Sequence, residues 1–390
     1  MKLQGAVCAA LFIPGGGVFI TFEEIVSFEN LYKAYKRARI GKRKRAATAQ
    51  YEASAIFVTE RLAHILASKQ YIPSKFETFY VYEPKKRLVQ APAFVDKVVQ
   101  HALVDNMLYD AITHGFIRDS HASQIGKGTH VGLDRLKFHM IDYFRKRKGH
   151  DEENRRKIGL PHRTMDEWDY AQGWVLKADV RKFFASIDHD IVKAQLRERV
   201  ADDKVFDLMC TYIDSTDGLP LGYQTSQLLA LMYLDEFDHW VKERLRIKYY
   251  GRYMDDFYLI HESKEYLRFC LREINGYIAG LKLELNEKTG IFPLRNGIDF
   301  LGYHTYLTET GKVIRKLRHS AVKRMKARIK KWKLELAEGT VDLAHIWASY
   351  QAWDAHASHG DTRELRKKIR GLMDANFKEV NTHGNSTNRQ

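Results

Sequence analysis

Hydrophobic and polar positions along the chain predict a mixture of helices and strands. The segment 248–261, KYYGRYMDDFYLIH, has aromatic and aliphatic residues on both sides of Asp255 and Asp256. Such a run predicts two buried strands that meet at a tight turn. Residues 174–179 predict another short buried strand, which ends near Asp179. Because neighbouring buried carboxylates need compensating cations, the hairpin is a candidate cation site. The alternative is an Asp-Asp turn that faces water.

The same patterns predict the remaining elements. They are a helix at 51–70, a hairpin at 76–92, a helix at 94–115, a glycine-containing loop and helix at 123–136, a charged surface insertion at 141–172, a short hairpin at 297–305, a basic amphipathic helix at 312–333 and two helices at 341–375. The GKGT sequence within the glycine loop lacks the full spacing of an ATP-binding phosphate loop. A nucleotide hydrolase is therefore not favoured.

The charge of the chain favours a polyanionic partner. The 390 residues include 64 Lys and Arg against 49 Asp and Glu, a net charge of +15, which suits nucleic acid or an anionic membrane. Eight basic residues and no acid lie at 33–45, and eleven Lys or Arg lie at 312–333, so phosphate backbones are expected there. The sequence contains no run of 18 apolar residues, so a membrane-spanning helix is not expected. Three widely spaced cysteines fit a cytoplasmic protein.

Further motifs could contribute to the same site. The sequence GLPLG at 218–222 leads into a helix that begins near Thr225, and glycines beside a helix N-terminus let the backbone approach a nucleotide. Lys288 lies in a polar loop after a strand. Asp188, near the first turn of a helix, is expected to be a cap. Taken singly, each motif is equally consistent with an ordinary turn, loop or helix start.

The succession of these motifs resembles the palm of reverse transcriptases. A strand aspartate, a Gly-Pro-Gly turn with a helix, a tyrosine-flanked Asp-Asp hairpin, a lysine loop and a Phe-Leu-Gly hairpin follow one another in the chain. Residues 253–256 match the YMDD motif of that family, and Asp179 matches its partner. The resemblance covers residues 28–360. It implies an α+β right-hand polymerase fold of fingers, palm and thumb, and RNA-directed DNA synthesis.

The resemblance also implies two Mg²⁺ ions, or Mn²⁺ in their place. The metal-binding positions would be Asp179, Val180, Asp255 and Asp256, with the three aspartates as catalytic residues. Hard oxygen ligands favour Mg²⁺, and two metals explain why distant carboxylates must converge. Catalysis would then rest on positioning and electrostatics. Asp255 is favoured over Asp256, because adjacent strand residues point to opposite faces.

The same resemblance implies a set of residues that would surround the incoming nucleotide. Phe184, five residues after Asp179, takes the position of the bulky side chain that blocks a ribose 2′-hydroxyl. The substrates would therefore be dNTPs, and core packing is the alternative role of this ring. Lys85 and Arg87 match the fingertip residues that hold the triphosphate, or they are ordinary turn residues. The nucleotide-binding set is Lys85, Arg87, Phe184, Leu221, Gly222, Gln227 and Lys288.

An RNA template and a DNA or RNA primer are the expected partners of the basic segments. The candidate contacts are Lys42, Arg43, Lys44, Arg45, Lys323, Arg324, Lys326 and Lys330. The expected organisation is an apolar leader at 1–20, fingers and first palm elements at 21–175, a palm at 176–310, a helical basic thumb at 311–380 and a tail at 381–390.

Finer motifs resemble the reverse transcriptases of diversity-generating retroelements in bacteria and phages. They are ENLYKAY, VYEPKKRLV, VVQHAL and GKGTH, with Gln227 where many retroviral and intron enzymes have Pro. This implies copying of a template repeat in a structured RNA, misincorporation opposite adenines and a small helical accessory protein. The chain departs from this type at Leu221, commonly Ile, and in the insertion. The alternatives are an antiphage reverse transcriptase that uses a noncoding RNA, one that adds nucleotides without a template, and a catalytically silent RNA-binding module.

Overall fold

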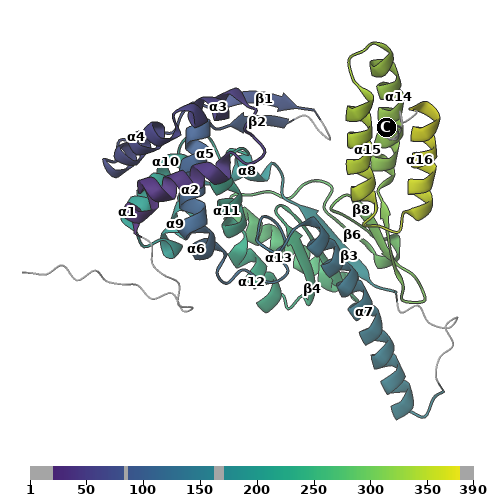
Figure 1. Cartoon of the computed structure of the whole chain (residues 1–390). Coiled ribbons are helices and arrows are strands. Elements are labelled where there is room, and N and C mark those ends of the chain that lie inside the picture. The colour runs from purple at the N-terminus through teal and green to yellow at the C-terminus, as the bar shows by residue number, and fades with distance from the viewer. Residues whose placement is uncertain (1–20, 83–86, 162–170, 378–390) are drawn as a thin grey trace, which may run out of the picture.

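A computed structural model describes residues 21–82, 87–161 and 171–377. Helices near the N-terminus, a central sheet and a C-terminal group of helices form three regions (Figure 1). The predicted leader and tail lie outside the described residues, as does part of the hairpin tip at 83–86. The mixture of helices and antiparallel strands agrees with the predicted α+β class.

The N-terminal region consists of helices and one hairpin. Its first two helices begin at side-chain caps: Thr21 and Glu24 form a capping box at the first, and the Ser27 side chain accepts a backbone N–H at the second. The predicted helices at 51–70 and 94–115 and the hairpin at 76–92 are confirmed, each helix being divided in two. The elements are α1 (Phe22–Ile25), α2 (Phe28–Ala38), α3 (Ala46–Ala53), α4 (Ala55–Ala67), β1 (Glu77–Val81), β2 (Arg87–Ala91), α5 (Phe94–Leu103), a π-helical turn (Val104–Leu108) and α6 (Tyr109–Thr113).

The central sheet contains the predicted Asp-Asp hairpin. Its strands lie in the order β4 (Tyr249–Tyr253), β5 (Asp256–His261), β3 (Trp174–Asp179) and β6 (Gly290–Pro293), and all neighbours are antiparallel. The tight turn between two buried strands is therefore confirmed, and β3 lies directly beside it.

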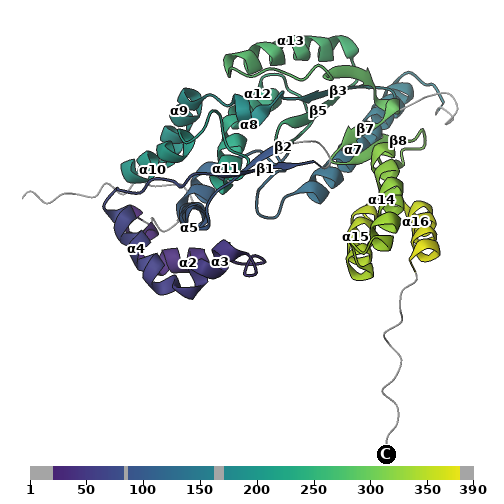
Figure 2. The ribbon, with the colours of Figure 1, turned by 90° about the horizontal axis from the view of Figure 1, so that it is seen from above.

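Both faces of this sheet are covered, which explains why its strands are apolar throughout. Leu176 and Phe257 point to one face and join a core with helices that include α13 (Lys264–Gly280). Val175 and Tyr258 point to the other face and pack with α7 (Thr129–Lys157). Figure 2 shows α13 along one side of the molecule and α2–α4 on the opposite side. The other helices near the sheet are α8 (Phe183–Ser186), α9 (His189–Arg199), α10 (Asp203–Ile213), α11 (Gln224–Tyr233) and α12 (Asp235–Glu243).

The segment 141–172 was expected to be a surface insertion, and the structure shows that its residues up to Lys157 belong to a helix that begins before it. Helix α7 continues without a break to Lys157 and extends away from the sheet (Figure 1). Tyr143 and Phe144 are buried against the sheet. Together with Leu136 and Met140 they form one apolar face of the helix. The many charged residues that follow Phe144 make this helical pattern difficult to recognise in the sequence. Residues 162–170 lie outside the described residues.

The C-terminal region begins with a three-stranded sheet. The predicted hairpin at 297–305 is confirmed, but the helix expected from 312 starts only at His319. Residues 313–317 alternate between buried and less buried positions and pair with the preceding strand, so the two-residue period applies here. The two predicted helices at 341–375 are present. The elements are a short 3₁₀ helix (Leu294–Asn296), β7 (Ile298–Phe300), β8 (Tyr303–Leu307), β9 (Val313–Leu317), α14 (His319–Ala337), α15 (Leu343–Ala357) and α16 (Arg363–Asn376).

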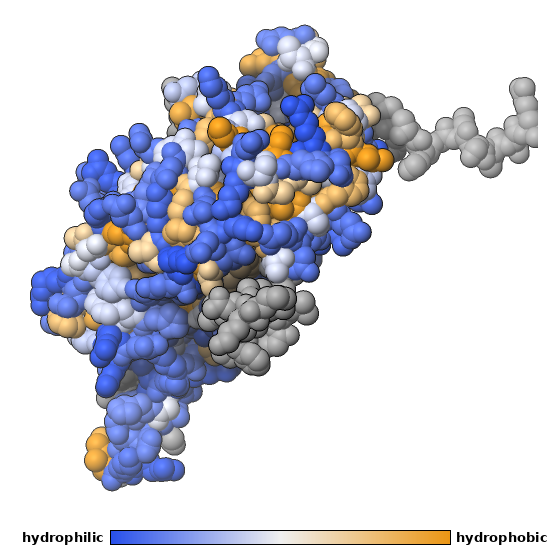
Figure 3. Space-filling view, turned by 90° about the vertical axis from the view of Figure 1, so that its left-hand side faces the viewer, coloured by the Kyte–Doolittle hydropathy of each residue, from blue (hydrophilic) through white to orange (hydrophobic). Residues whose placement is uncertain are grey.

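The surface is mainly polar. The face in Figure 3 is mostly hydrophilic, with hydrophobic residues in patches between the charged ones. Within the described ranges, no helix combines the length and the hydrophobicity needed to cross a bilayer.

Candidate active site at the β4–β5 turn

Met254 and Asp255 form the turn of the hairpin. Tyr253 pairs with Asp256, so two residues connect the strands. Met254 has a φ of 55°, in the left-handed region that short hairpin turns use. This region costs a residue with a side chain roughly 1–2 kcal/mol, so neighbouring groups must hold the turn in place.

The strand register brings the predicted aspartates together. Asp179 lies directly opposite Asp256, and opposite residues of an antiparallel pair share a face of the sheet. The Val180 N–H donates to the Asp255 carbonyl at 3.0 Å. The four predicted metal positions, distant in sequence, therefore converge at one end of the sheet.

Lys177 also belongs to this site, and the sequence reasoning missed it. Its ammonium contacts the Asp256 carboxylate. Burial lowers the pKa of Lys177 to about 7, and the negative charges of Asp179 and Asp255 oppose that shift. The signal was available, because a residue two positions before Asp179 on a strand shares its face. Lys177 is thus a cation of the protein itself among the carboxylates.

A second missed residue, Asn286, connects the predicted lysine loop to Asp179. The Asn286 N–H donates to the Asp179 carbonyl at 2.7 Å, and its side-chain amide donates to the Asp179 carboxylate at 3.4 Å. The Asn286 side-chain oxygen accepts the Lys288 N–H at 3.1 Å. The exposed Lys288 is therefore close to the aspartates in the fold. Nothing in the sequence singled out Asn286.

The structure also brings Phe184 to the GLPLG turn. The Phe184 carbonyl accepts the Leu219 N–H at 2.7 Å. The ring itself is half-buried, packed against the core. Leu221 is 41% exposed, and Gln227 on α11 accepts a hydrogen bond from Ser123 at 2.7 Å. The three predicted nucleotide contacts thus lie on α8, on the GLPLG turn and on α11.

Gly222 lies against the backbone of β2. A Cβ atom at this position would be 1.9 Å from the Gln90 carbonyl oxygen, so only glycine fits without displacing the strand. The role of the glycine seen here is close packing of β2 on the turn. Of the two fingertip candidates on the same hairpin, Lys85 lies outside the described residues, and for Arg87 only its backbone position at the start of β2 is described.

Asp188 is a cap, as predicted. Its carboxylate accepts the Ile191 N–H at 3.1 Å at the start of α9, and it also pairs with Lys282 at 2.6 Å. Its carboxylate is therefore already engaged in capping and in an ion pair.

The donor set at the turn fits magnesium. In the described part of the chain, no group of three or more His, Cys, Asp or Glu side chains is placed to hold a metal ion. Mg²⁺ in polymerase-type sites needs only one or two carboxylates, because water and substrate phosphates supply the other oxygens. Asp179 and the turn aspartates offer such hard oxygens, and the negative charges of Asp179 and Asp255 partly oppose the lowering of the Lys177 pKa by burial.

The basic segment at 42–45 is partly neutralised within the protein. The Glu52 carboxylate pairs with Arg43 at 2.6 Å and with Arg39 at 2.5 Å. Lys44 and Arg45 are exposed, and Lys42 is half-buried. Arg43 is therefore a weaker nucleic-acid candidate than its neighbours, because it already has a carboxylate partner.

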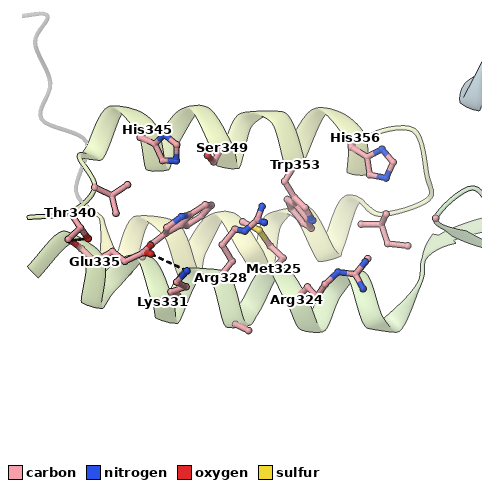
Figure 4. A pocket seen from close by; sticks show the side chains of 16 residues that line it. Arg324, Met325, Arg328, Lys331, Glu335, Thr340, His345, Ser349, Trp353 and His356 are labelled. Carbon is pink, nitrogen blue, oxygen red and sulfur yellow. Dashed lines mark hydrogen bonds and ion pairs between the residues drawn. The ribbon is translucent and has the colours of Figure 1, made fainter. Parts of the chain in front are cut away.

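Helix α14 forms one wall of a basic groove with α15 (Figure 4). The groove has a volume of about 900 Å³, and Arg324, Arg328 and Lys331 line it from α14. Trp353 and His356 line it from α15. The other predicted basic residues of α14, Lys323, Lys326 and Lys330, are exposed on the helix outside the groove. Cations next to an indole suit a nucleic-acid backbone and its bases.

The chain belongs to the reverse transcriptase family. The family model described as reverse transcriptase (RNA-dependent DNA polymerase) matches residues 83–305, more than half of the chain. This range contains Asp179, the GLPLG turn and the YMDD hairpin. The chain therefore has the right-hand polymerase fold of this family.

Similar proteins are distant. Protein YkfC of Escherichia coli strain K12 is 27% identical over 175 residues, which cover 33% of this chain and 46% of that protein. The chain thus matches about half the length of this relative. The structure of apo telomerase from Candida tropicalis, truncated from its C-terminal domain, has a TM-score of 0.42 and 13% identity over 64% of this chain and 58% of that one. Telomerase from Candida albicans in complex with a fragment of telomeric RNA has a TM-score of 0.41 and 11% identity over 78% of this chain and 55% of that one.

Proposed function

We propose that this reverse transcriptase makes cDNA from a structured RNA in a diversity-generating type of bacterial or phage retroelement. The observation that carries the catalytic part is the register that puts Asp179 opposite Asp256 and ties Val180 to Asp255. The retroelement type is supported by the motifs quoted above and by Gln227 after Thr225 and Ser226.

Asp179, Asp255 and Asp256 are the catalytic residues in this proposal. They would hold two Mg²⁺ ions together with Val180. When bound, such ions activate the primer 3′-hydroxyl and neutralise the triphosphate and leaving pyrophosphate. The chain's own part is to orient the carboxylates: Asn286 hydrogen-bonds Asp179, and Val180 holds the turn carbonyl. Lys177 neutralises Asp256.

The remaining predicted sites would bind the dNTP, the template and the primer. Phe184, Leu221, Gly222, Gln227 and Lys288 would contact the dNTP together with Lys85 and Arg87. Template and primer would lie between the fingers (21–175) and the thumb (311–380), over the palm (176–310). Their phosphates would contact the basic residues of α14 and of 42–45. A small helical accessory protein and a cytoplasmic location belong to the same proposal.

Primer extension tests this function. We expect the purified protein with Mg²⁺, dNTPs and a primed RNA to extend the primer, with errors concentrated opposite template adenines. Extension with errors spread evenly over the four template bases would favour an antiphage reverse transcriptase that uses a noncoding RNA. Synthesis without any template would favour the nucleotide-adding type. Tight RNA binding without extension of any primed RNA would reject catalysis.

Phe184→Ala is expected to weaken discrimination against ribonucleotides. Removal of a half-buried ring beside the nucleotide turn makes room for a 2′-hydroxyl, so the ratio of kcat/KM for dGTP to that for GTP should fall by roughly 10²-fold. The measurement is single-nucleotide incorporation at a template cytosine. Phe183→Leu is the matched control, because the Phe183 side chain is buried in the core: it should lower the melting temperature and leave the ratio unchanged. An unchanged ratio in Phe184→Ala would reject this role.

A further inference from the structure

A buried arginine lies directly behind the catalytic turn. Arg252, on β4, is 1% exposed, and Asp238 on α12 is fully buried. Two N–H groups of the guanidinium donate to the two oxygens of the Asp238 carboxylate, at 2.7 and 2.5 Å. The Tyr250 hydroxyl donates to the same carboxylate at 2.5 Å. Burial alone would lower the pKa of Arg252, but the Asp238 carboxylate raises it, so the ion pair persists.

The rest of the guanidinium connects the turn to its surroundings. Arg252 Nη1 donates to the Met254 carbonyl at 2.9 Å. Arg252 Nη2 also reaches the Ser120 hydroxyl and the Leu231 carbonyl, each at 3.4 Å. The Arg252 backbone N–H donates to the Asp119 carbonyl at 2.9 Å. One side chain therefore joins the turn to α11, α12 and the segment at 119–120.

These contacts fix the peptide that precedes Asp255. The Met254 carbonyl and the Asp255 N–H belong to one planar peptide unit, so the arginine sets the orientation of that plane. On the other side of Asp255, its own carbonyl accepts the Val180 N–H. Asp255 is thus held at both of its peptide planes, and the left-handed φ of Met254 immediately precedes the first of them.

Stability alone does not explain this arrangement. A fully buried ion pair can usually be replaced by apolar residues of similar volume with little or no loss of stability. What apolar residues cannot supply is a donor aimed at the Met254 carbonyl. From this geometry we infer that Arg252 is a positioning residue for polymerisation: it holds the Met254–Asp255 peptide so that the Asp255 carboxylate faces Asp179, and Asp238 orients the guanidinium. The inference rests on the proposed catalytic role of Asp255.

Arg252→Lys is the direct test. Lysine keeps the charge but offers one compact ammonium in place of a planar fork, so it cannot bind both Asp238 oxygens and the Met254 carbonyl together. We expect kcat for nucleotide incorporation to fall by about 10²-fold. KM for dNTP and the affinity for primed RNA should stay within about threefold of wild type. Arg268→Lys, on the exposed side of α13, is the matched control and should keep wild-type kcat.

A double variant separates positioning from folding. Arg252→Met with Asp238→Leu removes both buried charges, and its melting temperature should stay near that of wild type, because the gain from removing a buried ion pair offsets the loss of the partner of the Tyr250 hydroxyl. Its kcat should nevertheless fall as far as that of Arg252→Lys. If the double variant has a wild-type melting temperature and a kcat within threefold of wild type, the inference is rejected. It is also rejected if RNA affinity and KM deteriorate in Arg252→Lys as much as kcat does.

Asp255→Asn, measured in parallel, tells the two proposals apart. If Asp255→Asn is active, the proposed catalytic site is wrong. If Asp255→Asn is inactive while Arg252→Lys has wild-type kcat, the catalytic site stands and only the positioning role of Arg252 fails.

Discussion

Asp255→Asn is expected to lower nucleotide incorporation by at least about 10³-fold while leaving the fold intact. Asparagine has nearly the same size but no charge, so the turn loses a hard anionic ligand for the proposed metal ions. Because Asp179 and Asp256 lie beside it, removal of one negative charge also relieves repulsion among the carboxylates. The melting temperature should therefore be unchanged or slightly higher. The measurements are single-turnover incorporation on primed RNA and thermal unfolding.

Binding of primed RNA should be nearly unaffected, because the duplex contacts lie on other elements. Asp190→Asn, on the exposed surface of α9, removes the same charge away from the site and should keep full activity. An Asp255→Asn protein that retained more than a tenth of wild-type incorporation would show that Asp255 is not a catalytic ligand.

Gly222→Ala is expected to damage both the packing of β2 and the activity. The new Cβ would be 1.9 Å from the Gln90 carbonyl and 3.0 Å from Pro92, and a backbone atom cannot move aside as a flexible side chain can. Strand β2 must shift away from α11, at a cost of about 1–3 kcal/mol or more. We expect a melting temperature at least about 3 °C lower and a loss of kcat/KM for dNTP of about 10²-fold.

Gly276→Ala provides the comparison. Gly276 lies within α13 and has no atom within 4 Å of the position of a new Cβ, so alanine should stabilise the helix by about 0.5–1 kcal/mol. Wild-type melting and activity in Gly222→Ala would mean that β2 does not pack on the turn as described.

The sequence predicted the parts of the site that depend on local pattern. The apolar residues around Asp255 and Asp256 specify two strands and a short turn, and the run before Asp179 specifies a third strand. The order of motifs then identified the family. The pairing of Asp179 with Asp256 needed the structure, because register between strands distant in sequence depends on the packing of both faces.

Residues that act through buried contacts could not be predicted. Asp238 looks like one of several acids on an amphipathic helix, and only the fold shows that it is buried against Arg252. The strand at 313–317 was missed because Val313 and Leu317 fit helical spacing as well as alternation. Helix α7 was cut short in the prediction because charged residues dominate the composition beyond Phe144, although the apolar spacing continues from Leu136 as far as Phe144.

The antiparallel pairing of β3 with β5 also limits how this enzyme can evolve. Side chains alternate between the two faces along β3, so loss or gain of a single residue within 174–179 would turn every following side chain to the opposite face. An apolar side chain would then take the place of the Asp179 carboxylate, and the carboxylate would point into the helical core. Substitutions at one position at a time leave that alternation intact. Variation in length is therefore confined to the loops around the sheet, where additions do not alter the parity of the catalytic strand.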